Sequence, residues 1–264
     1  ALFDEPVKIA HEGFEITPRL HELLETYQLS LGTYDTALQY FYDENGKPRE
    51  IGTLLKNPEY AKTLLAYKNF GATVFYDPGH PHSLVPDIIN TTTKDPENPG
   101  RLAIQDFQNY RVIERAPVCG LYRSYHVCSM GLPSSGGLTL IEALGILNGL
   151  EFENDQTTKI LPENLYKIFE ATRIAFADRN VYMADPAFVD HPGKELLARD
   201  YLAKRRQEIG PFQAIPHTFQ GSENDWDSFR IPQRPQEENG TAHISIVDSK
   251  GNILSFTTSI EQAF

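Results

Sequence analysis

The sequence lacks a hydrophobic run that could cross a membrane, because no stretch approaches the roughly 18 apolar residues that a spanning helix needs. It is also short of positive charge, since 24 Lys and Arg stand against 36 Asp and Glu and leave a net charge of −12. Such an acidic balance argues against nucleic acid as a partner, because phosphates need basic surfaces. The opening ALFDEPVKIAHEGF has no basic flank and no apolar centre, so it is not a signal peptide. We expect either a cytoplasmic protein or an internal piece of a longer one.

Cysteine is scarce as well, with only Cys119 and Cys128, which make neither a disulfide framework nor a zinc site. Both lie in VCGLYRSYHVCSM, which is typical of a β-hairpin near 112–130. A two-residue loop at Arg123 and Ser124 would set the cysteines opposite each other, close enough for a disulfide. We favour two buried free thiols, because an unpaired cysteine behaves as a small hydrophobic residue.

A metal site is not indicated elsewhere. HELLE places His21 and Glu25 one helical turn apart with Glu22 between them, as in zinc enzymes, but the second histidine and a third ligand are missing. We interpret this pattern as a solvated helix face, and we expect no metal and no cofactor.

Residues 1–209 are expected to be mostly helical. Helices are predicted to start at the Thr17-Pro18 and Asn57-Pro58 steps, where proline fits the first helical turn. Further helices are predicted from near Pro81, from LTLIEALGILNGL to about Gly149, and over 162–186 and 194–208. Residues 210–240 are rich in proline and polar residues and contain the single tryptophan, Trp226, so we interpret them as a linker.

After this linker the hydrophobic period changes to two, which predicts a β-hairpin within 241–264. Asp248-Ser249-Lys250-Gly251-Asn252 fits a three-residue loop with Gly251 in the left-handed region. In that register Asp248 faces Asn252 and Thr241 faces Ser259. A two-residue loop would pair Thr241 with Ile260 instead.

The three-residue loop also puts Thr257 and Glu261 diagonally on the same face as Thr241. A threonine hydroxyl is a weak nucleophile until a base removes its proton, and the residue's own α-amino group, with a pKa near 8, suits that task. That amine exists only if the bond after Gly240 is cut. The alternative is that Thr241 is an ordinary strand residue, because threonine is common in strands.

Several segments resemble one family. ENGTAHISIVDSKGNILSFTTSIEQAF resembles the start of the small subunit of gamma-glutamyltranspeptidases, N-terminal-nucleophile hydrolases made as one precursor that cleaves itself before a threonine. MGLPSSGGLTLIEALGILNGLEF and EATRIAFADRNVYMADPAFV resemble large-subunit signatures, and IGTLLKNPEYAKTLLAYKNFGATVFYDP and YRVIERAP match in order. The resemblance implies an α+β chain that is part of a four-layer αββα fold, with 1–209 in the large subunit, 210–240 as the linker to the processing site, and 241–264 beginning the small subunit.

The resemblance also assigns roles by position. Thr241 matches the nucleophile, Gly240-Thr241 the processing bond, and Ser259 a second hydroxyl residue, usually threonine, that hydrogen-bonds the nucleophile. Glu261 stands where members specific for gamma-glutamyl groups usually have asparagine, a contact to the substrate's amino-acid end. His243 matches a family histidine that we interpret as structural.

The function implied is acyl transfer or hydrolysis of gamma-glutamyl amides such as glutathione, with an amino acid, a peptide or water as acceptor. A cephalosporin-acylase-like amidohydrolase and a non-catalytic binding homologue are the alternatives. The resemblance implies a periplasmic or extracellular location and association with a further small-subunit portion, because the family's oxyanion hole lies in sequence after this region. By itself, the 264-residue chain is expected to stay uncut and inactive.

Overall fold

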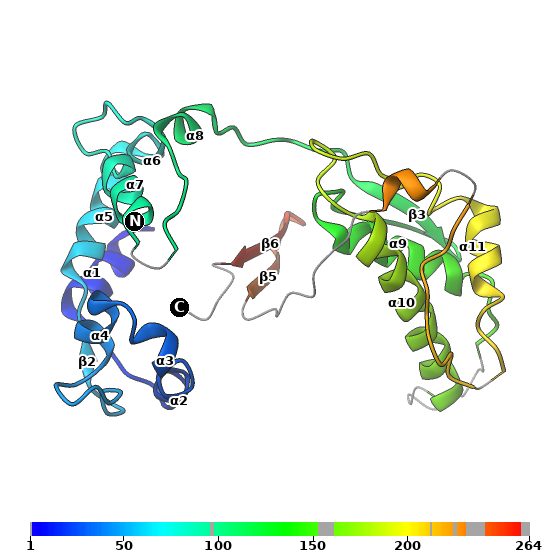
Figure 1. Cartoon of the computed structure of the whole chain (residues 1–264), viewed down its shortest axis with the longest axis horizontal. Coiled ribbons are helices and arrows are strands. Elements are labelled where there is room, and N and C mark those ends of the chain that lie inside the picture. Colours follow the sequence, from blue (N-terminus) through cyan, green and yellow to red (C-terminus); the bar gives the residue numbers. More distant parts are fainter. Residues whose placement is uncertain are drawn as a thin grey trace. The chain divides into compact units, whose positions relative to one another are not determined.

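The computed structural model describes residues 2–95, 98–152, 161–211, 213–223, 226–230 and 241–259. The chain divides into two compact units, one made of residues 1–112 with 237–264 and the other of residues 113–236. The architecture combines helices with small antiparallel sheets, and the described residues form three two-stranded sheets, β1–β2, β3–β4 and β5–β6 (Figure 1).

The first unit is largely helical. Its elements before the last hairpin are α1 (Asp4–Glu12), β1 (Phe14–Glu15), α2 (Pro18–Thr26), α3 (Gln28–Leu31), α4 (Asp35–Phe41), β2 (Leu54–Leu55), α5 (Pro58–Phe70), α6 (Thr73–Tyr76), α7 (Val85–Thr93) and α8 (Ile104–Asn109). The two predicted proline starts are confirmed, since α2 and α5 begin at these prolines. The Thr17 hydroxyl and the Asn57 side-chain oxygen cap them by accepting backbone N–H groups at 3.1 Å and 2.9 Å.

The helix predicted from near Pro81 begins later, at Val85. Pro86 explains the position, because proline lacks an N–H and is tolerated in the first turn, where that donor has no intrahelical partner. The residues just before α7 form a turn instead, in which the Ser83 N–H donates to the His80 carbonyl at 2.9 Å.

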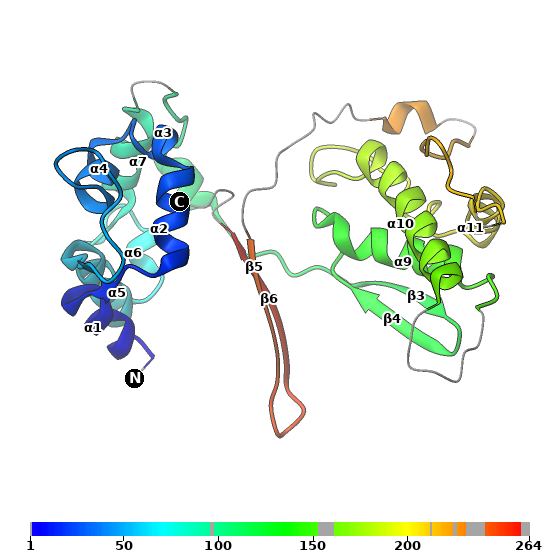
Figure 2. The ribbon, with the colours of Figure 1, turned by 90° about the horizontal axis from the view of Figure 1, so that it is seen from below.

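The second unit packs a hairpin and three helices around two hydrophobic clusters. Its elements are β3 (Val118–Tyr122), β4 (Tyr125–Ser129), α9 (Ser135–Leu147), α10 (Pro162–Tyr182), α11 (Arg199–Arg206) and the short 3₁₀ helix η1 (Trp226–Phe229). The β3–β4 hairpin packs on α9, which also contacts α10 and α11 (Figure 2). Gly120 allows this close approach, because a Cβ there would lie 2.4 Å from Ile141 Cγ2 of α9.

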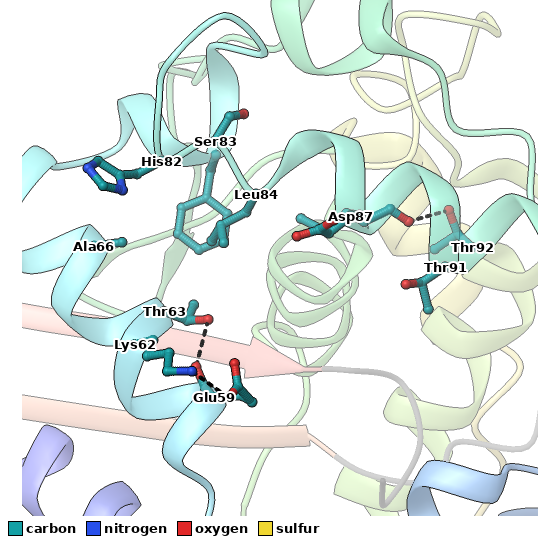
Figure 3. Close-up of a pocket in the computed structure, with 12 residues that line it drawn as sticks. Glu59, Lys62, Thr63, Ala66, His82, Ser83, Leu84, Asp87, Thr91 and Thr92 are labelled. Carbon is teal, nitrogen blue, oxygen red and sulfur yellow. Dashed lines mark hydrogen bonds and ion pairs between the residues drawn. The ribbon is translucent and has the colours of Figure 1, made fainter.

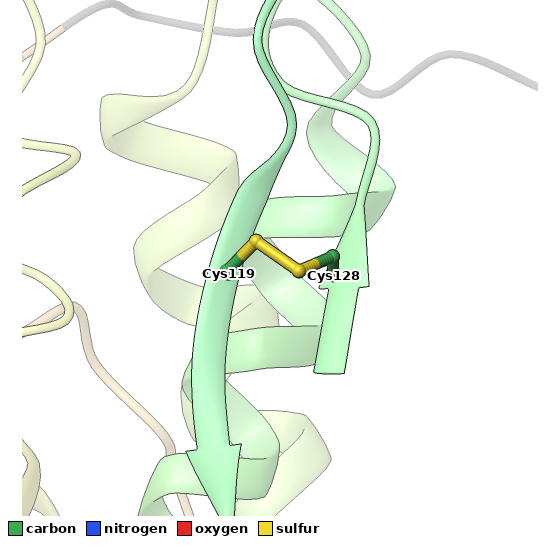
Figure 4. Close-up of a disulfide and its surroundings, with 2 residues drawn as sticks. All are labelled: Cys119 and Cys128. Atoms are coloured by element: carbon green, nitrogen blue, oxygen red, sulfur yellow. A yellow bond between two sulfur atoms is a disulfide. The ribbon is translucent and has the colours of Figure 1, made fainter. Parts of the chain in front are cut away.

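The cysteine pair corrects one interpretation. The predicted register is confirmed, since Cys119 lies opposite Cys128, but the two sulfurs form a disulfide and the interpretation as buried free thiols is wrong (Figure 4). Both cysteines are exposed. Strand side chains alternate between two faces, so the neighbour Gly120 faces α9 while Cys119 points to the other side.

The 210–240 segment departs from the linker interpretation in its described part. Trp226 is only 5% exposed and belongs to a core cluster with Tyr182 and Tyr201. Its ring meets theirs at centroid distances of 5.3 Å and 5.0 Å. Proline and polar residues indicated a loop, but a loop can be fixed by long-range contacts that composition does not reveal. Residues 231–240 lie outside the described residues.

Candidate active site

The hairpin of β5 (Thr241–Val247) and β6 (Ile253–Ser259) carries the predicted nucleophile. Its register runs from Thr241 opposite Ser259 to Val247 opposite Ile253, which confirms the pairing expected from a three-residue loop. Gly251 takes the left-handed conformation, with φ of 81°. The pairing of Thr241 with Ile260 is thereby excluded.

Asp248 stabilises the turn that sets this register. Its carboxylate accepts the backbone N–H groups of Lys250 and Asn252, each at 2.8 Å, and the Asn252 side-chain amide at 2.7 Å. These hydrogen bonds, first the one from the Asn252 side chain, lower the pKa of Asp248 because they favour the ionised form. The Asp248 carboxylate is therefore the common acceptor that holds the turn in place.

A hydroxyl pair stands at the open end of the hairpin. The Thr241 hydroxyl donates to Ser259 Oγ at 3.1 Å, a distance within hydrogen-bond reach. Cross-strand pairing produces this contact directly, because opposite side chains on one face of an antiparallel pair are nearest neighbours. The hydrogen bond orients the Thr241 hydroxyl.

The same face continues as a row of polar side chains centred on His243. His243 Nδ1 lies 2.7 Å from Thr257 Oγ1, and Nε2 lies 3.2 Å from the hydroxyls of both Ser245 and Ser255. Sequence reasoning placed Thr257 on this face but did not identify the two serines. The period-two alternation from Thr241 was the signal that could have found them, because it puts residues 243 and 245 on the nucleophile's side.

The opposite face of the hairpin is apolar. Ile244, Ile246, Leu254 and Phe256 alternate with the polar row, and each is about half exposed, at 49%, 49%, 50% and 51%. All residues of both strands are exposed. The hairpin thus separates a hydroxyl-rich face from an apolar face suited to packing.

Two predicted site residues cannot be placed. Gly240 and Glu261 lie outside the described residues, so the structure describes Thr241 and Ser259 of the four predicted positions. In HELLE, His21 Nε2 lies 3.8 Å from Glu25, and its Nδ1 lies 2.9 Å from the Arg49 carbonyl. Among the described residues there is no group of three or more His, Cys, Asp or Glu side chains that could hold a metal ion.

A separate cavity of about 800 Å³ lies in the first unit and is lined mainly from α5 and α7 (Figure 3). Several of its polar groups are engaged locally: Lys62 contacts Glu59 at 2.6 Å, and the Thr63 and Thr92 hydroxyls donate to carbonyls of their own helices. Neither Thr241 nor Ser259 lines this cavity. It therefore adds nothing to the candidate site.

Comparison with known proteins gives a consistent result. A family model described as gamma-glutamyltranspeptidase matches residues 1–264. The chain is 30% identical over 270 residues to a glutathione hydrolase proenzyme of Bacillus subtilis, covering 100% of this chain and 44% of the relative. It is also 30% identical over 258 residues to the acylase ACY 1 proenzyme of a Pseudomonas strain, covering 98% of this chain and 42% of the relative.

Two solved structures are also similar to this chain. The crystal structure of Helicobacter pylori gamma-glutamyltranspeptidase matches with a TM-score of 0.69 and 31% identity, over 81% of this chain and 58% of that one. A cephalosporin acylase from Bacillus halodurans matches with a TM-score of 0.64 and 25% identity, over 78% and 37% respectively. The chain spans less than half the length of these two curated relatives. No described helix is both long and apolar enough to cross a membrane.

Proposed function

Because the chain belongs to the gamma-glutamyltranspeptidase family, we propose that it supplies the nucleophile of a self-processing acyl-transfer enzyme. The substrates are gamma-glutamyl amides such as glutathione, and the acceptor is water, an amino acid or a peptide. Relatives named glutathione hydrolase proenzyme support both the substrate class and the processing step.

The proposed processing begins at Thr241. Its hydroxyl oxygen attacks the Gly240 carbonyl carbon and the peptide C–N bond breaks. The Thr241 nitrogen keeps its own hydrogen and takes up the hydroxyl proton, so that it becomes the new amine. Water then hydrolyses the ester and releases a carboxylate at Gly240. Since Gly240 has no side chain, the hydroxyl can approach its carbonyl without obstruction.

The freed α-amino group then serves as the base for substrate turnover. It takes the hydroxyl proton as the Thr241 oxygen attacks the substrate carbonyl, and the amine product leaves with that proton. Water or an acceptor amine resolves the acyl ester. The observation that carries this proposal is the hydroxyl pair, in which Thr241 lies 3.1 Å from Ser259 at the first position of its strand.

The proposal also assigns each part of the chain to a subunit. Residues 1–209 belong to the large subunit, 210–240 lead to the processing site, and 241–264 begin the small subunit, within a four-layer αββα fold. The small subunit is completed by a further portion that associates with this chain.

A periplasmic or extracellular location is supported by the Cys119–Cys128 disulfide, because disulfides persist in oxidising compartments.

Substrate choice is the point on which a second candidate function rests. Glu261 occupies a position at which we expect a contact to the substrate's amino-acid end, and its carboxylate suits an α-ammonium group. The similarity to an acylase proenzyme and to a cephalosporin acylase favours amide hydrolysis with another acyl group as the alternative.

The test is turnover by the full-length protein of two amides, glutathione and a cephalosporin carrying an acyl side chain. We expect glutathione to be hydrolysed and Thr241→Ala to abolish the reaction. Thr258→Ala is the matched control, because it removes a hydroxyl from the opposite face of β6 and should leave turnover unchanged. Preference for the cephalosporin would favour the acylase function. No turnover of either amide would indicate a non-catalytic binding homologue.

A further inference from the structure

A cavity of about 670 Å³ lies in the second unit, beside the start of β3. Its walls come from residues 115–119 at the start of β3, from the stretch 131–138 that leads from β4 into α9, and from the loop 186–197 between α10 and α11. Neither Thr241 nor Ser259 lines it. A cavity of this size with a mostly apolar wall and a few placed polar groups is typical of a site for a small molecule.

The apolar wall of this cavity is part of the hydrophobic core of the second unit. Leu132 and Leu138 are 8% and 4% exposed and belong to a core cluster, and Val118 and Leu197 pack against that cluster. Because the core holds these side chains, the wall is formed before any ligand binds. A ligand with a hydrophobic body would gain free energy by covering the wall, since apolar surface would be removed from water.

The polar side chains on the wall are Arg115, His191 and Lys194, and none of the described residues that line the cavity carries a carboxylate. This local balance is opposite to that of the whole chain, in which 36 Asp and Glu outnumber 24 Lys and Arg. Within the part of the chain that the structure describes, neither Arg115 nor Lys194 makes a hydrogen bond or an ion pair. Both cations are exposed and are therefore available to an anionic ligand.

The loop that carries His191 and Lys194 is fixed by its own contacts. The Gly193 N–H donates to His191 Nδ1 at 3.1 Å, and the Leu196 N–H donates to the carbonyl of Pro192, which is buried. A Cβ on Gly193 would lie 2.7 Å from His191 Nδ1, so glycine is needed for the imidazole to approach this closely. The site is therefore preorganised, which lowers the entropic cost of binding a ligand.

The hydrogen bond from Gly193 also sets the tautomer of His191. A neutral imidazole has one acceptor nitrogen and one donor nitrogen, and Nδ1 is the acceptor here, so Nε2 carries the proton. All three polar side chains on the wall are then hydrogen-bond donors. Such a set matches a group that only accepts hydrogen bonds, above all a carboxylate, which a guanidinium can bind through two parallel N–H donors.

We propose that this cavity binds a small organic carboxylate with an apolar body. Arg115 and Lys194 bind the carboxylate, His191 is a further donor, and the body of the ligand covers the wall around Leu132 and Leu138. A bare anion such as phosphate offers the same charge but leaves the apolar wall in contact with water. The inference goes beyond the proposed function, because it requires neither self-cleavage nor acyl transfer.

Titration of the full-length protein with 3-phenylpropanoate, followed by ligand-observed NMR, tests the site. We expect a dissociation constant of about 1 mM or below, as the size of this ligand allows. The neutral isostere 3-phenylpropanamide should bind roughly tenfold more weakly, because it has no charge to pair with the two cations. Acetate and inorganic phosphate, which carry the charge without the apolar body, should also bind more weakly.

Substitutions locate the bound ligand. Arg115→Met and Lys194→Met keep an apolar stem and remove the charge, so each should weaken the binding of 3-phenylpropanoate about tenfold. Both side chains are exposed, so the variants should fold normally, as circular dichroism can check. Lys204→Met is the matched control, because Lys204 is an exposed lysine of the same unit that does not line the cavity. Its affinity for the ligand should equal that of the wild type.

Three results would overturn the proposal. The first is no detectable binding of 3-phenylpropanoate, or equal binding of the acid and its amide. The second is unchanged affinity in Arg115→Met or in Lys194→Met, since the ligand would then be bound elsewhere. The third is equal binding of phosphate, which would mean that the cavity takes a bare anion only. The titration involves neither cleavage nor turnover, so its failure and the failure of the proposed function are seen separately.

Discussion

The segment 213–229 and the β5–β6 hairpin adjoin the same stretch of sequence, residues 231–240, yet they are held in opposite ways. The segment depends on long-range contacts with α10 and α11, and its Trp226 is 5% exposed. The hairpin depends on its own turn and cross-strand pairs, and its Phe256 is 51% exposed. Tertiary packing therefore holds the chain on the N-terminal side of residues 231–240, and local turn chemistry holds it on the C-terminal side.

Removing an aromatic ring from each region should give the largest contrast. Trp226→Ala should lower the free energy of unfolding of the second unit by about 3–5 kcal/mol, because it leaves a cavity between Tyr182 and Tyr201. Phe256→Ala should change stability by at most about 0.5 kcal/mol, since its ring is half exposed. Urea unfolding of the chain followed by circular dichroism measures both. Equal losses of unfolding free energy in the two variants would contradict this difference between the regions.

The buried acids Glu142 and Asp178 of the second unit predict a pH dependence of stability opposite in sign to that expected from Asp248 in the hairpin. Glu142 is fully buried in α9, and burial, followed by the neighbouring Asp178, raises its pKa well above the usual value; Tyr201 and Arg205 are the other groups facing it. The folded state therefore holds a proton that the unfolded state releases. Its stabilising contribution is complete below the unfolded pKa and is lost as pH rises through the folded pKa.

Glu142→Gln tests this by replacing the protonated acid with a neutral amide. The free energy of unfolding should fall less steeply towards alkaline pH in the variant than in the wild type, as measured by urea titrations from pH 5 to 9. Identical slopes in the two proteins would mean that Glu142 does not hold the extra proton.

These two regions also mark how far the sequence predicts the structure. Asp248 and Gly251 are turn residues with known geometry, so the pairing of Thr241 with Ser259 could be predicted exclusively from local rules. The role of Trp226 could not, because its partners Tyr182 and Tyr201 lie on helices distant in sequence. For the cysteine pair, the sequence allowed either a disulfide or two buried free thiols. The structure has the disulfide, with both cysteines on the exposed face of the hairpin.

The hairpin is most sensitive at its left-handed glycine. Gly251→Ala should destabilise strand pairing by about 1–2 kcal/mol, because φ of 81° disfavours a residue with a Cβ. Amide chemical shifts of β5 and β6 should move towards unpaired values, while those of α10 stay unchanged. Ser249→Ala, in the same loop, is the matched control. Unaltered hairpin shifts in Gly251→Ala would show that the register is held by something other than the turn.

The smallest expected effect concerns the hydroxyl pair. Ser259→Ala removes one hydrogen bond from Thr241, a loss of about 1 kcal/mol, so self-cleavage and turnover in the full-length protein should slow roughly fivefold and not stop. Ser255→Ala, which removes a hydroxyl four residue pairs away on the same strand and face, is the comparison. Wild-type rates in Ser259→Ala would remove Ser259 from the site.

The most direct test of the central claim, that Thr241 becomes a new N-terminus, is the intact mass of the purified full-length protein. We expect two polypeptides formed without added protease, the second beginning with Thr241, and a single uncut polypeptide for Thr241→Ala. A wild-type protein that stays whole, or a Thr241→Ala variant that splits at the same bond, would contradict it.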